Sequence, residues 1–340
     1  MKAFVTGTDG YIGVLFAGHL QQHGHQVTGC DTGFYRNGWI YNVAGELPRT
    51  LSKDIRRVTV EDLRGHDAVI HLAELSNDPL GQLAPNITFD INHGGSVHLA
   101  RMAKQAGVKR FIYFSSCSVY GASSEVIDES GEVNPLTAYA KCKVRVESDL
   151  SQMADDDFTP TFLRNATAYG ASPRLRFDIV VNNLAGFAFC TQEIKMLSDG
   201  TPWRPQVHVL DICKAARCVL EAKRELVHGQ TFNVGDSREN YQVKTVAEII
   251  SSTFPGCSLS IGDRGGDQRD YRVSFDKIKR VLPGFACEWT VKRGAEQLLE
   301  IFDRVQLTKE LFESDAHTRL KRITYLLETR QIDADFFWRA

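Results

Sequence analysis

The chain has 340 residues, of which 43% are hydrophobic and 24% charged, the proportions of an ordinary globular protein. Its formal net charge of -2 argues against a basic surface for nucleic acid, and no apolar run approaches the ~20 residues that span a bilayer. The eight cysteines form neither a C-x-x-C pair nor a zinc-like cluster with histidine, so we expect no metal site in a cytoplasmic protein without membrane attachment.

The first half of the chain alternates short apolar runs with helical patterns. Strand-like runs cover residues 2–6, 26–30, 68–72, 111–116 and 161–163, and helical spacing covers residues 11–23, 92–107 and the segment around position 139. Strands that alternate with helices imply parallel strands joined by right-handed crossovers. The sequence therefore predicts an α/β fold of the Rossmann type, with a doubly wound parallel sheet.

The second half is less regular. Proline-containing segments at 202–205 and 255–256 are expected to be loops, and residues 262–270 (GDRGGDQRD) a charged, glycine-rich loop. The last fifty residues have helical spacing, as in Leu320, Ile323 and Leu327. This half is expected to form a smaller, mostly helical domain.

Three glycines follow the first strand, at Gly7, Gly10 and Gly13 of G-T-D-G-Y-I-G. The pattern lies between a strand and a helix at the start of an α/β series, which favours a pyrophosphate loop over a plain strand–helix turn. Glycine lets the backbone approach the phosphates, and the helix start offers free N–H groups. Asp9, inside the loop, is expected to cap the helix.

An acid about 20 residues further on completes this dinucleotide pattern. Asp31 ends the run QVTGCD. A carboxylate there accepts hydrogen bonds from the ribose hydroxyls of NAD and repels the additional phosphate of NADP. Arg36 is close enough in sequence to weaken that discrimination. NAD is the expected cofactor.

Tyr139 and Lys143 are four positions apart, which places them on one face of a helix. On its own this spacing also fits an ordinary surface pair. Free tyrosine has a pKa near 10, and a neighbouring ammonium group favours the phenolate and lowers that pKa. A tyrosine so placed can act as a general base.

Together with the glycines, Ser116, Tyr139 and Lys143 resemble the extended short-chain dehydrogenase/reductase family, and within it the NAD-dependent nucleotide-sugar epimerases and dehydratases. The resemblance runs from residue 2 to about 290. It implies that these three residues are catalytic. It also implies an NAD-binding domain of residues 1–170 plus about 206–240, and a nucleotide-sugar-binding domain of about 171–205 plus 241–340.

The resemblance extends to further cofactor-binding residues. Asp54–Ile55 resembles the pair that holds the adenine, and Leu72–Ala73 matches a stretch that lines the cofactor, although Glu74 replaces a more usual small residue. Asn92 is similar to the family's structural asparagine. The set that we expect to bind the cofactor is Gly7, Gly10, Tyr11, Ile12, Gly13, Asp31, Asp54, Ile55, Leu72, Ala73, Asn92, Tyr139 and Lys143.

On the substrate side, LRNATAYG at 163–170 resembles the strand end before the sugar site, and residues 182–184 resemble the start of a substrate-binding helix. Arg204 and Arg264 fall where the family places two arginines on the nucleotide diphosphate, a task that suits the planar guanidinium fork. The set that we expect to bind the nucleoside-diphosphate sugar is Ser116, Ser118, Asn165, Thr167, Asn183, Leu184, Arg204, Arg264 and Asp267.

Several reactions of the family share one first step, in which Tyr139 takes a hydroxyl proton from the sugar. In the 4,6-dehydratases an Asp–Glu pair follows the catalytic hydroxyl, where this chain has Cys117 and Ser118. Epimerisation at C4 is therefore expected. A nucleotide-sugar dehydrogenase or ketoreductase, and a non-catalytic NAD(P)-binding regulatory protein, are the alternatives. The resemblance also implies a homodimer through the helices at 92–106 and 137–152.

Overall fold

The computed structural model describes residues 1–339 except 44, 77 and 266–267; the side chains of residues 82, 83 and 264 also lie outside the described part. Its largest element is a seven-stranded sheet in the order β11-β7-β5-β4-β1-β2-β3. The strands are β1 (Lys2–Thr6), β2 (Gln26–Asp31), β3 (Arg49–Ser52), β4 (Ala68–His71), β5 (Arg110–Ser116), β7 (Thr159–Asn165) and β11 (Thr231–Val234). All six neighbouring pairs are parallel, so the predicted doubly wound sheet is confirmed.

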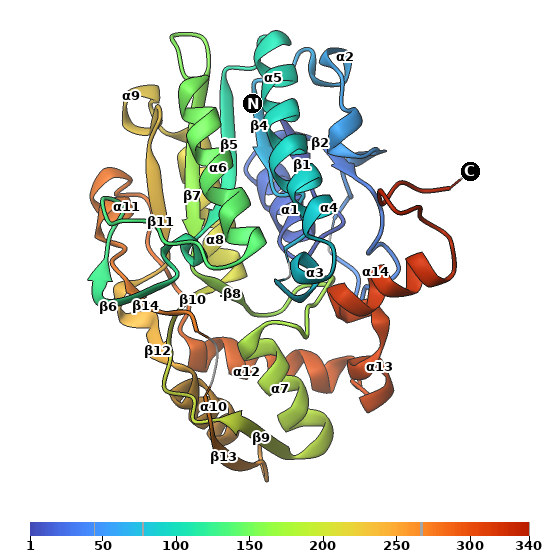
Figure 1. Ribbon diagram of the computed structural model, residues 1–340, viewed down its shortest axis with the longest axis vertical. Helices are drawn as coiled ribbons and strands as arrows, with labels where there is room; N and C mark the ends of the chain where they lie inside the picture. Colours follow the sequence, from blue (N-terminus) through green and yellow to red (C-terminus); the bar gives the residue numbers. More distant parts are fainter. Residues whose placement is uncertain (44, 77, 266–267, 340) are drawn as a thin grey trace.

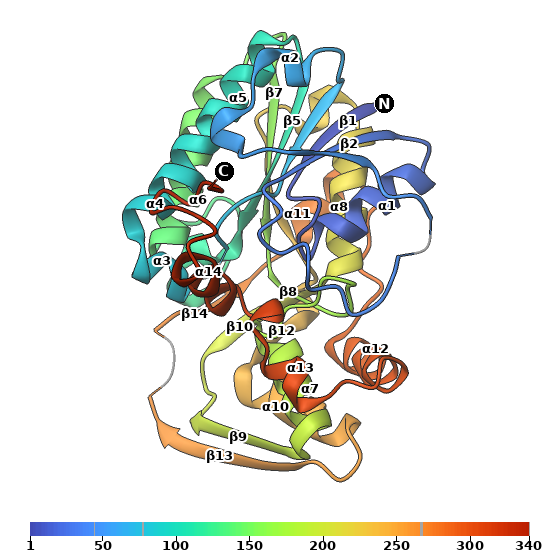
Figure 2. The same cartoon turned by 90° about the vertical axis from the view of Figure 1, so that its right-hand side faces the viewer.

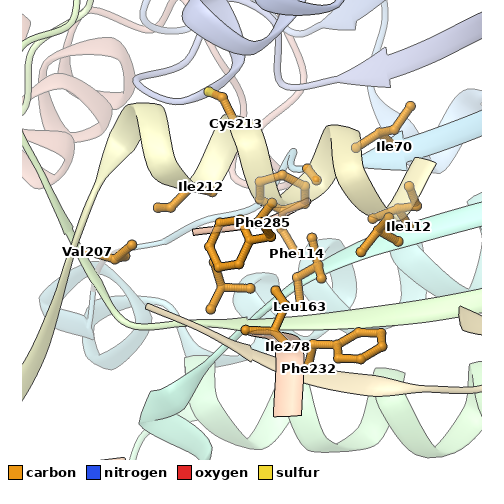
Figure 3. Close-up of a cluster of buried hydrophobic side chains, with 14 of the residues drawn as sticks. Ile70, Ile112, Phe114, Leu163, Val207, Ile212, Cys213, Phe232, Ile278 and Phe285 are labelled. Atoms are coloured by element: carbon orange, nitrogen blue, oxygen red, sulfur yellow. The ribbon is translucent and has the colours of Figure 1, made fainter. Parts of the chain in front are cut away.

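Helices cover both faces of this sheet, as Figure 2 shows with the sheet almost edge-on. On one face lie α1 (Gly13–Gln22) and α8 (Val209–Glu221), and on the other lie α5 (Ser96–Gln105) and α6 (Ala138–Gln152). Each face has its own apolar cluster. The first includes Phe114, Leu163 and Ile212 (Figure 3), and the second includes Phe111 and Val146. Because the strands are buried on both sides, they appear in the sequence as continuous apolar runs.

The chain leaves this sheet to build a lower lobe, which lies below the carboxyl ends of the strands in Figure 1. Its helices are α7 (Val180–Thr191), α10 (Val243–Thr253), α12 (Val291–Arg304) and α13 (Lys309–Glu313), which share a third apolar cluster. Small sheets accompany the two lobes. They consist of β8 (Thr167–Tyr169), β10 (Trp203–His208) and β12 (Asn240–Gln242), of β9 (Glu193–Ser198) and β13 (Ser258–Arg264), and of β6 (Ala122–Ile127) and β14 (Asp270–Val273). The sheet formed by β9 and β13 lies in the lower lobe (Figure 2).

Short helices complete the structure. They are α2 (Val60–Leu63), α3 (Asp78–Leu83), α4 (Pro85–Phe89), α9 (Arg224–Val227), α11 (Asp276–Val281) and α14 (Arg319–Glu328), with helical turns η1 (Ile55–Arg57), η2 (Asp90–Gly95), η3 (Cys117–Tyr120), η4 (Ser237–Glu239) and η5 (Asp315–His317). After α13 the chain returns from the lower lobe, and α14 lies beside α3 at the sheet (Figure 1, Figure 2). No helix within the described residues is both long and apolar enough to cross a membrane.

Two expected loops are partly strands. Residues 203–205 belong to β10, where Pro205 lies opposite Asn240, and residues 262–264 end β13. Both strands belong to sheets of only two or three strands. β10 is the central strand of its sheet, but in the described structure residues 203–205 pair only with β12 and residues 206–208 only with β8. Proline and glycine are tolerated where a strand segment pairs on one side only, and there they conceal the strand signal in the sequence.

Candidate active site

A cavity of about 710 Å³ lies between the carboxyl ends of the large sheet and the lower lobe. The strand order reverses between β4 and β1, the point at which open α/β sheets bind their ligands. Many of the expected residues line this cavity: Gly7, Gly10, Tyr11, Ile12, Gly13, Asp31, Asp54, Ile55, Leu72, Ala73, Ser116, Ser118, Tyr139, Lys143, Asn165, Thr167 and Arg204. Residues from distant parts of the chain are thus brought to one site.

The glycine loop has no room for side chains. Gly7 has φ +80°, and a Cβ there would lie 3.0 Å from the backbone nitrogen of Ala73. At Gly13 a Cβ would lie 1.9 Å from the carbonyl oxygen of Gly7. The backbone can therefore approach a bound phosphate closely, and α1 begins at Gly13 without a side-chain cap on its free N–H groups.

The expected cap by Asp9 is wrong. The residue before α1 is Ile12, and the Asp9 carboxylate instead pairs with the Arg36 guanidinium at 2.8 Å. Asp9 lies three positions too early in the chain to reach the first N–H groups of the helix as an N-cap does. Arg36, which we considered able to weaken discrimination against NADP, is thus paired with a residue of the protein itself.

Asp31 ends β2 at the wall of the cavity and is only 9% exposed. Its carboxylate accepts hydrogen bonds from the backbone N–H of Asp9 at 3.0 Å and of Gly33 at 2.8 Å. Burial raises the pKa of Asp31 to about 6, and the charge of Asp9 acts in the same direction. The carboxylate is therefore charged above about pH 6 and held rigidly.

The three expected catalytic side chains come from two neighbouring elements. Ser116 is the last residue of β5, and its Oγ accepts the N–H of Ser118 at 3.1 Å. Thr137 caps α6, because its Oγ1 accepts the N–H of Ala140 at 3.2 Å. Tyr139 therefore lies in the first turn of α6, with the Lys143 ammonium 5.1 Å from the centre of its ring.

Lys143 has an acidic partner that the expected set does not include. Its ammonium forms an ion pair with Glu74 and donates to the carbonyl of Phe114. Tyr113 donates its hydroxyl to the other oxygen of Glu74 at 2.6 Å. Overall the pKa of Tyr139 is raised and not lowered as expected: burial is the largest cause, Lys143 lowers the pKa, and Glu74 raises it again. The sequence marks Glu74 as unusual at its position but gives no sign of its partner.

Beside Ser116, two side chains of the described cavity lining carry polar atoms without partners. Within the described residues, Asn165 Oδ1 and Ser118 Oγ are buried without hydrogen-bond partners. Asn165 is held by its amide, which donates to the carbonyl of Ser115 at 3.2 Å. Arg204 is buried, with its guanidinium 5.5 Å from the ring centre of Tyr271. These atoms can receive hydroxyl and phosphate groups of a ligand.

Some expected residues lie elsewhere. Asn92 does not line the cavity, and its amide bonds to the backbone N–H and C=O of Leu75, at 2.8 and 3.0 Å. Asn183 and Leu184 line a second cavity of about 410 Å³, which shares Val180, Ser198 and Val243 with the first. The side chain of Arg264 and the whole of Asp267 lie outside the described residues.

Further charged residues, which we did not predict from the sequence, also line the cavity. Arg176 pairs with Asp178 at 2.8 Å and donates to Ser76 Oγ at 3.1 Å. Arg319, at the start of α14, reaches the same cavity from the far end of the chain. The alternation of charged and apolar residues in PRLRFD (173–178) is a signal for the first pair. The position of Arg319 depends on tertiary structure alone.

A profile of the NAD-dependent epimerase/dehydratase family matches residues 3–235. A UDP-glucose 4-epimerase of Corynebacterium glutamicum is 29% identical over 85% of this chain and 92% of its own length. A dTDP-glucose 4,6-dehydratase of Streptomyces niveus is 27% identical over 88% of this chain and 92% of its own length. Among solved structures, a UDP-glucuronic acid 4-epimerase of Bacillus cereus, in complex with UDP-glucuronic acid and NAD, has TM-score 0.77 and 20% identity, covering 90% of this chain and all of that one.

Proposed function

Because the chain belongs to the NAD-dependent epimerase/dehydratase family, we propose that it epimerises a nucleoside-diphosphate sugar at C4 through a transient 4-keto sugar. The observation that carries this proposal is the common cavity of Ser116, Tyr139 and Lys143 beside the glycine loop. Relatives named UDP-glucose 4-epimerase support the choice of an epimerase.

The residues present fit a bound NAD. The crowded glycines, the uncapped start of α1 and the rigid Asp31 carboxylate would hold its pyrophosphate and adenosine ribose. Leu72, Ala73 and the Asp54–Ile55 pair would line its remaining surface. Bound NAD supplies reversible hydride transfer at the sugar carbon.

The chain's own residues would move the proton. Tyr139 as phenolate accepts the proton of the sugar hydroxyl, and Lys143 stabilises that phenolate. Ser116 donates a hydrogen bond to the same oxygen as it becomes a ketone. After the 4-keto sugar has rotated so that its opposite face meets the hydride donor, Tyr139 returns the proton to the sugar oxygen. The protein thus ends the cycle in its starting state.

The substrate would extend from this centre toward the lower lobe. Asn165 Oδ1 and Ser118 Oγ would accept hydrogen bonds from sugar hydroxyls, and Thr167 would lie beside them. Arg204 would bind the diphosphate. The adjoining cavity at Asn183 and Leu184 would receive the nucleoside. Arg264 and Asp267 stay predicted substrate contacts, and a homodimer and a cytoplasmic location stay predictions as well.

The chemistry of two positions argues against loss of water. Cys117 is buried, its thiol donates to the carbonyl of Arg164 at 3.1 Å, and burial raises its pKa far above neutrality. Ser118 has no ionisable group. Neither can act as the acid or base that dehydration needs. Asp31 disfavours NADP and with it the ketoreductase alternative.

The test uses purified protein without added cofactor and a panel of uridine, thymidine, guanosine, cytidine and adenosine diphosphate sugars, each followed by NMR. Interconversion of two C4 stereoisomers is expected, with the C4 hydrogen retained in D₂O because the hydride does not exchange with solvent. Turnover only with added NAD or NADPH would instead identify a dehydrogenase or ketoreductase. A 4-keto-6-deoxy product would identify a dehydratase.

A further inference from the structure

The C-terminal part of the chain covers the side of the dinucleotide site. Arg322 in α14 donates to the carbonyl of Phe34 at 3.0 Å, and Trp338 donates its indole N–H to the carbonyl of Thr32 at 2.6 Å. The ring of Phe337 lies between two guanidinium groups, Arg56 at 3.9 Å and Arg57 at 3.8 Å. Residues 318–339, the C-terminal strap, are therefore fixed to the segments that follow β2 and β3.

Arg319, a residue of this strap, lines the cavity. Its side chain is buried, with the residue 7% exposed, and its guanidinium lies 3.7 Å from the centre of the Tyr35 ring. Nη2 lies 3.9 Å from the position that a Cβ would take on Gly10 of the glycine loop. Nη1 is buried and has no hydrogen-bond partner within the described residues. Arg319 thus lines the cavity beside the phosphate loop with one charged donor that still has no acceptor in the described part of the chain.

The surroundings of Arg319 are rich in positive charge. Arg174 donates to the carbonyl of Tyr35 at 2.6 Å, and Arg176 lies on the same side of the cavity. Asp178 pairs with Arg176 and accepts the backbone N–H of Arg319 at 3.3 Å. The two carboxylate oxygens of Asp31 each accept one backbone N–H group. Leaving a buried guanidinium N–H without a hydrogen-bond partner is costly, so this arrangement favours an anionic acceptor from outside the chain.

We propose that Arg319 binds the pyrophosphate of NAD, so that the C-terminal strap completes the cofactor site opposite the glycine loop. The guanidinium fork suits two phosphate oxygens, and the loop N–H groups serve the other side of the same group. A cofactor held from both sides would stay bound through many turnovers, as the proposed epimerisation requires. The inference rests on NAD binding, and the test below separates it from the sugar reaction.

The experiment compares the full-length wild type with Arg319→Gln, Arg319→Lys and the control Lys321→Gln. Lys321 lies on the same helix but is exposed, and it donates to the carbonyl of Glu313. Two quantities are measured: the NAD that copurifies, and the rate at which it is released into excess fluorescent NADH. Loss of a hydrogen-bonded charge pair should weaken NAD binding about 10- to 100-fold in Arg319→Gln. The NAD affinity of Arg319→Lys should lie between those of Arg319→Gln and the wild type, and the NAD affinity of Lys321→Gln should match the wild type.

Competition by smaller ligands identifies the group that Arg319 binds. In Arg319→Gln, the affinity for ADP should fall by the same factor as the affinity for NAD. The affinity for adenosine, measured by competition, should equal that of the wild type. An equal loss of affinity for adenosine, or a rate of NAD release equal to that of the wild type, would overturn the proposal. If Arg319→Gln fails to fold, Arg319→Lys decides, because NAD affinity equal to the wild type would also overturn it. NAD retention without epimerisation contradicts only the proposed function, and a wild type without NAD affinity contradicts both.

Discussion

Glu74 forms a buried ion pair with Lys143, the residue that also carries the charge next to the Tyr139 ring. The two side chains are 2% and 4% exposed, so water screens the pair little. The carboxylate raises the pKa of Lys143 and also that of Tyr139, while Lys143 lowers the pKa of Tyr139. Glu74 therefore opposes part of the effect by which the lysine activates the tyrosine, and it keeps the lysine protonated.

Replacing Glu74 by glutamine should move the pH profile of turnover to lower pH. Without the carboxylate, Tyr139 loses its proton at lower pH, so the acidic limb of kcat/KM shifts down. Lys143 also loses its proton at lower pH, so the alkaline limb shifts in the same direction. The measurement is kcat/KM from pH 5 to 10, with exposed Glu61→Gln as control. An unmoved profile, or a shift to higher pH, would contradict this role.

Removing the lysine alone should destabilise the fold. Lys143→Met leaves Glu74 buried without its charge partner, which typically costs about 3–5 kcal/mol in the free energy of unfolding. Burial raises the pKa of Glu74 above its ordinary 4.5, so the charged form is disfavoured in the folded state and the loss should grow as pH rises above 4.5.

Urea unfolding at pH 5 and pH 8 measures this effect. The double variant Glu74→Gln/Lys143→Met should recover much of the stability, because no buried charge then lacks a partner. Equal losses for the single and double variants would mean that the ion pair is not the cause.

The sheet and the one-turn spacing of Tyr139 and Lys143 could be predicted because their sequence signals are local. Strands buried on both faces appear as apolar runs, and Tyr139 and Lys143 need only one helical turn to meet. Strands β10 and β13 were missed because proline and glycine, which are tolerated where a strand segment pairs on one side only, conceal the strand signal. Glu74 and Arg319 could not be assigned, because their partners lie on other elements and meet them only after the sheet and the C-terminal strap have packed.

Tyr139→Phe should abolish turnover and leave the cofactor in place. The phenol hydroxyl is the proposed proton acceptor, and general base catalysis contributes about 10²- to 10⁴-fold. The ring itself, which packs near the Lys143 ammonium, is retained. Turnover by NMR and the NAD content after denaturation are measured together, with exposed Tyr325→Phe as the matched control. A variant that still turns over at the wild-type rate would rule out Tyr139 as the base.

Asp31→Asn should reduce the preference for NAD over NADP. The carboxylate is held by two backbone N–H groups at the end of β2, so it cannot turn away from an additional phosphate. Like charges 4 Å apart repel by about 4 kcal/mol at an effective dielectric constant of 20, so the ratio of the two dissociation constants should change by at least about tenfold. Because burial raises the pKa of Asp31 to about 6, the comparison belongs at pH 8, where the wild-type carboxylate is charged. Fluorescence titration with NADH and NADPH gives both constants, and the exposed Asp335→Asn variant should leave their ratio unchanged. An unchanged ratio in Asp31→Asn would show that another group discriminates between the cofactors.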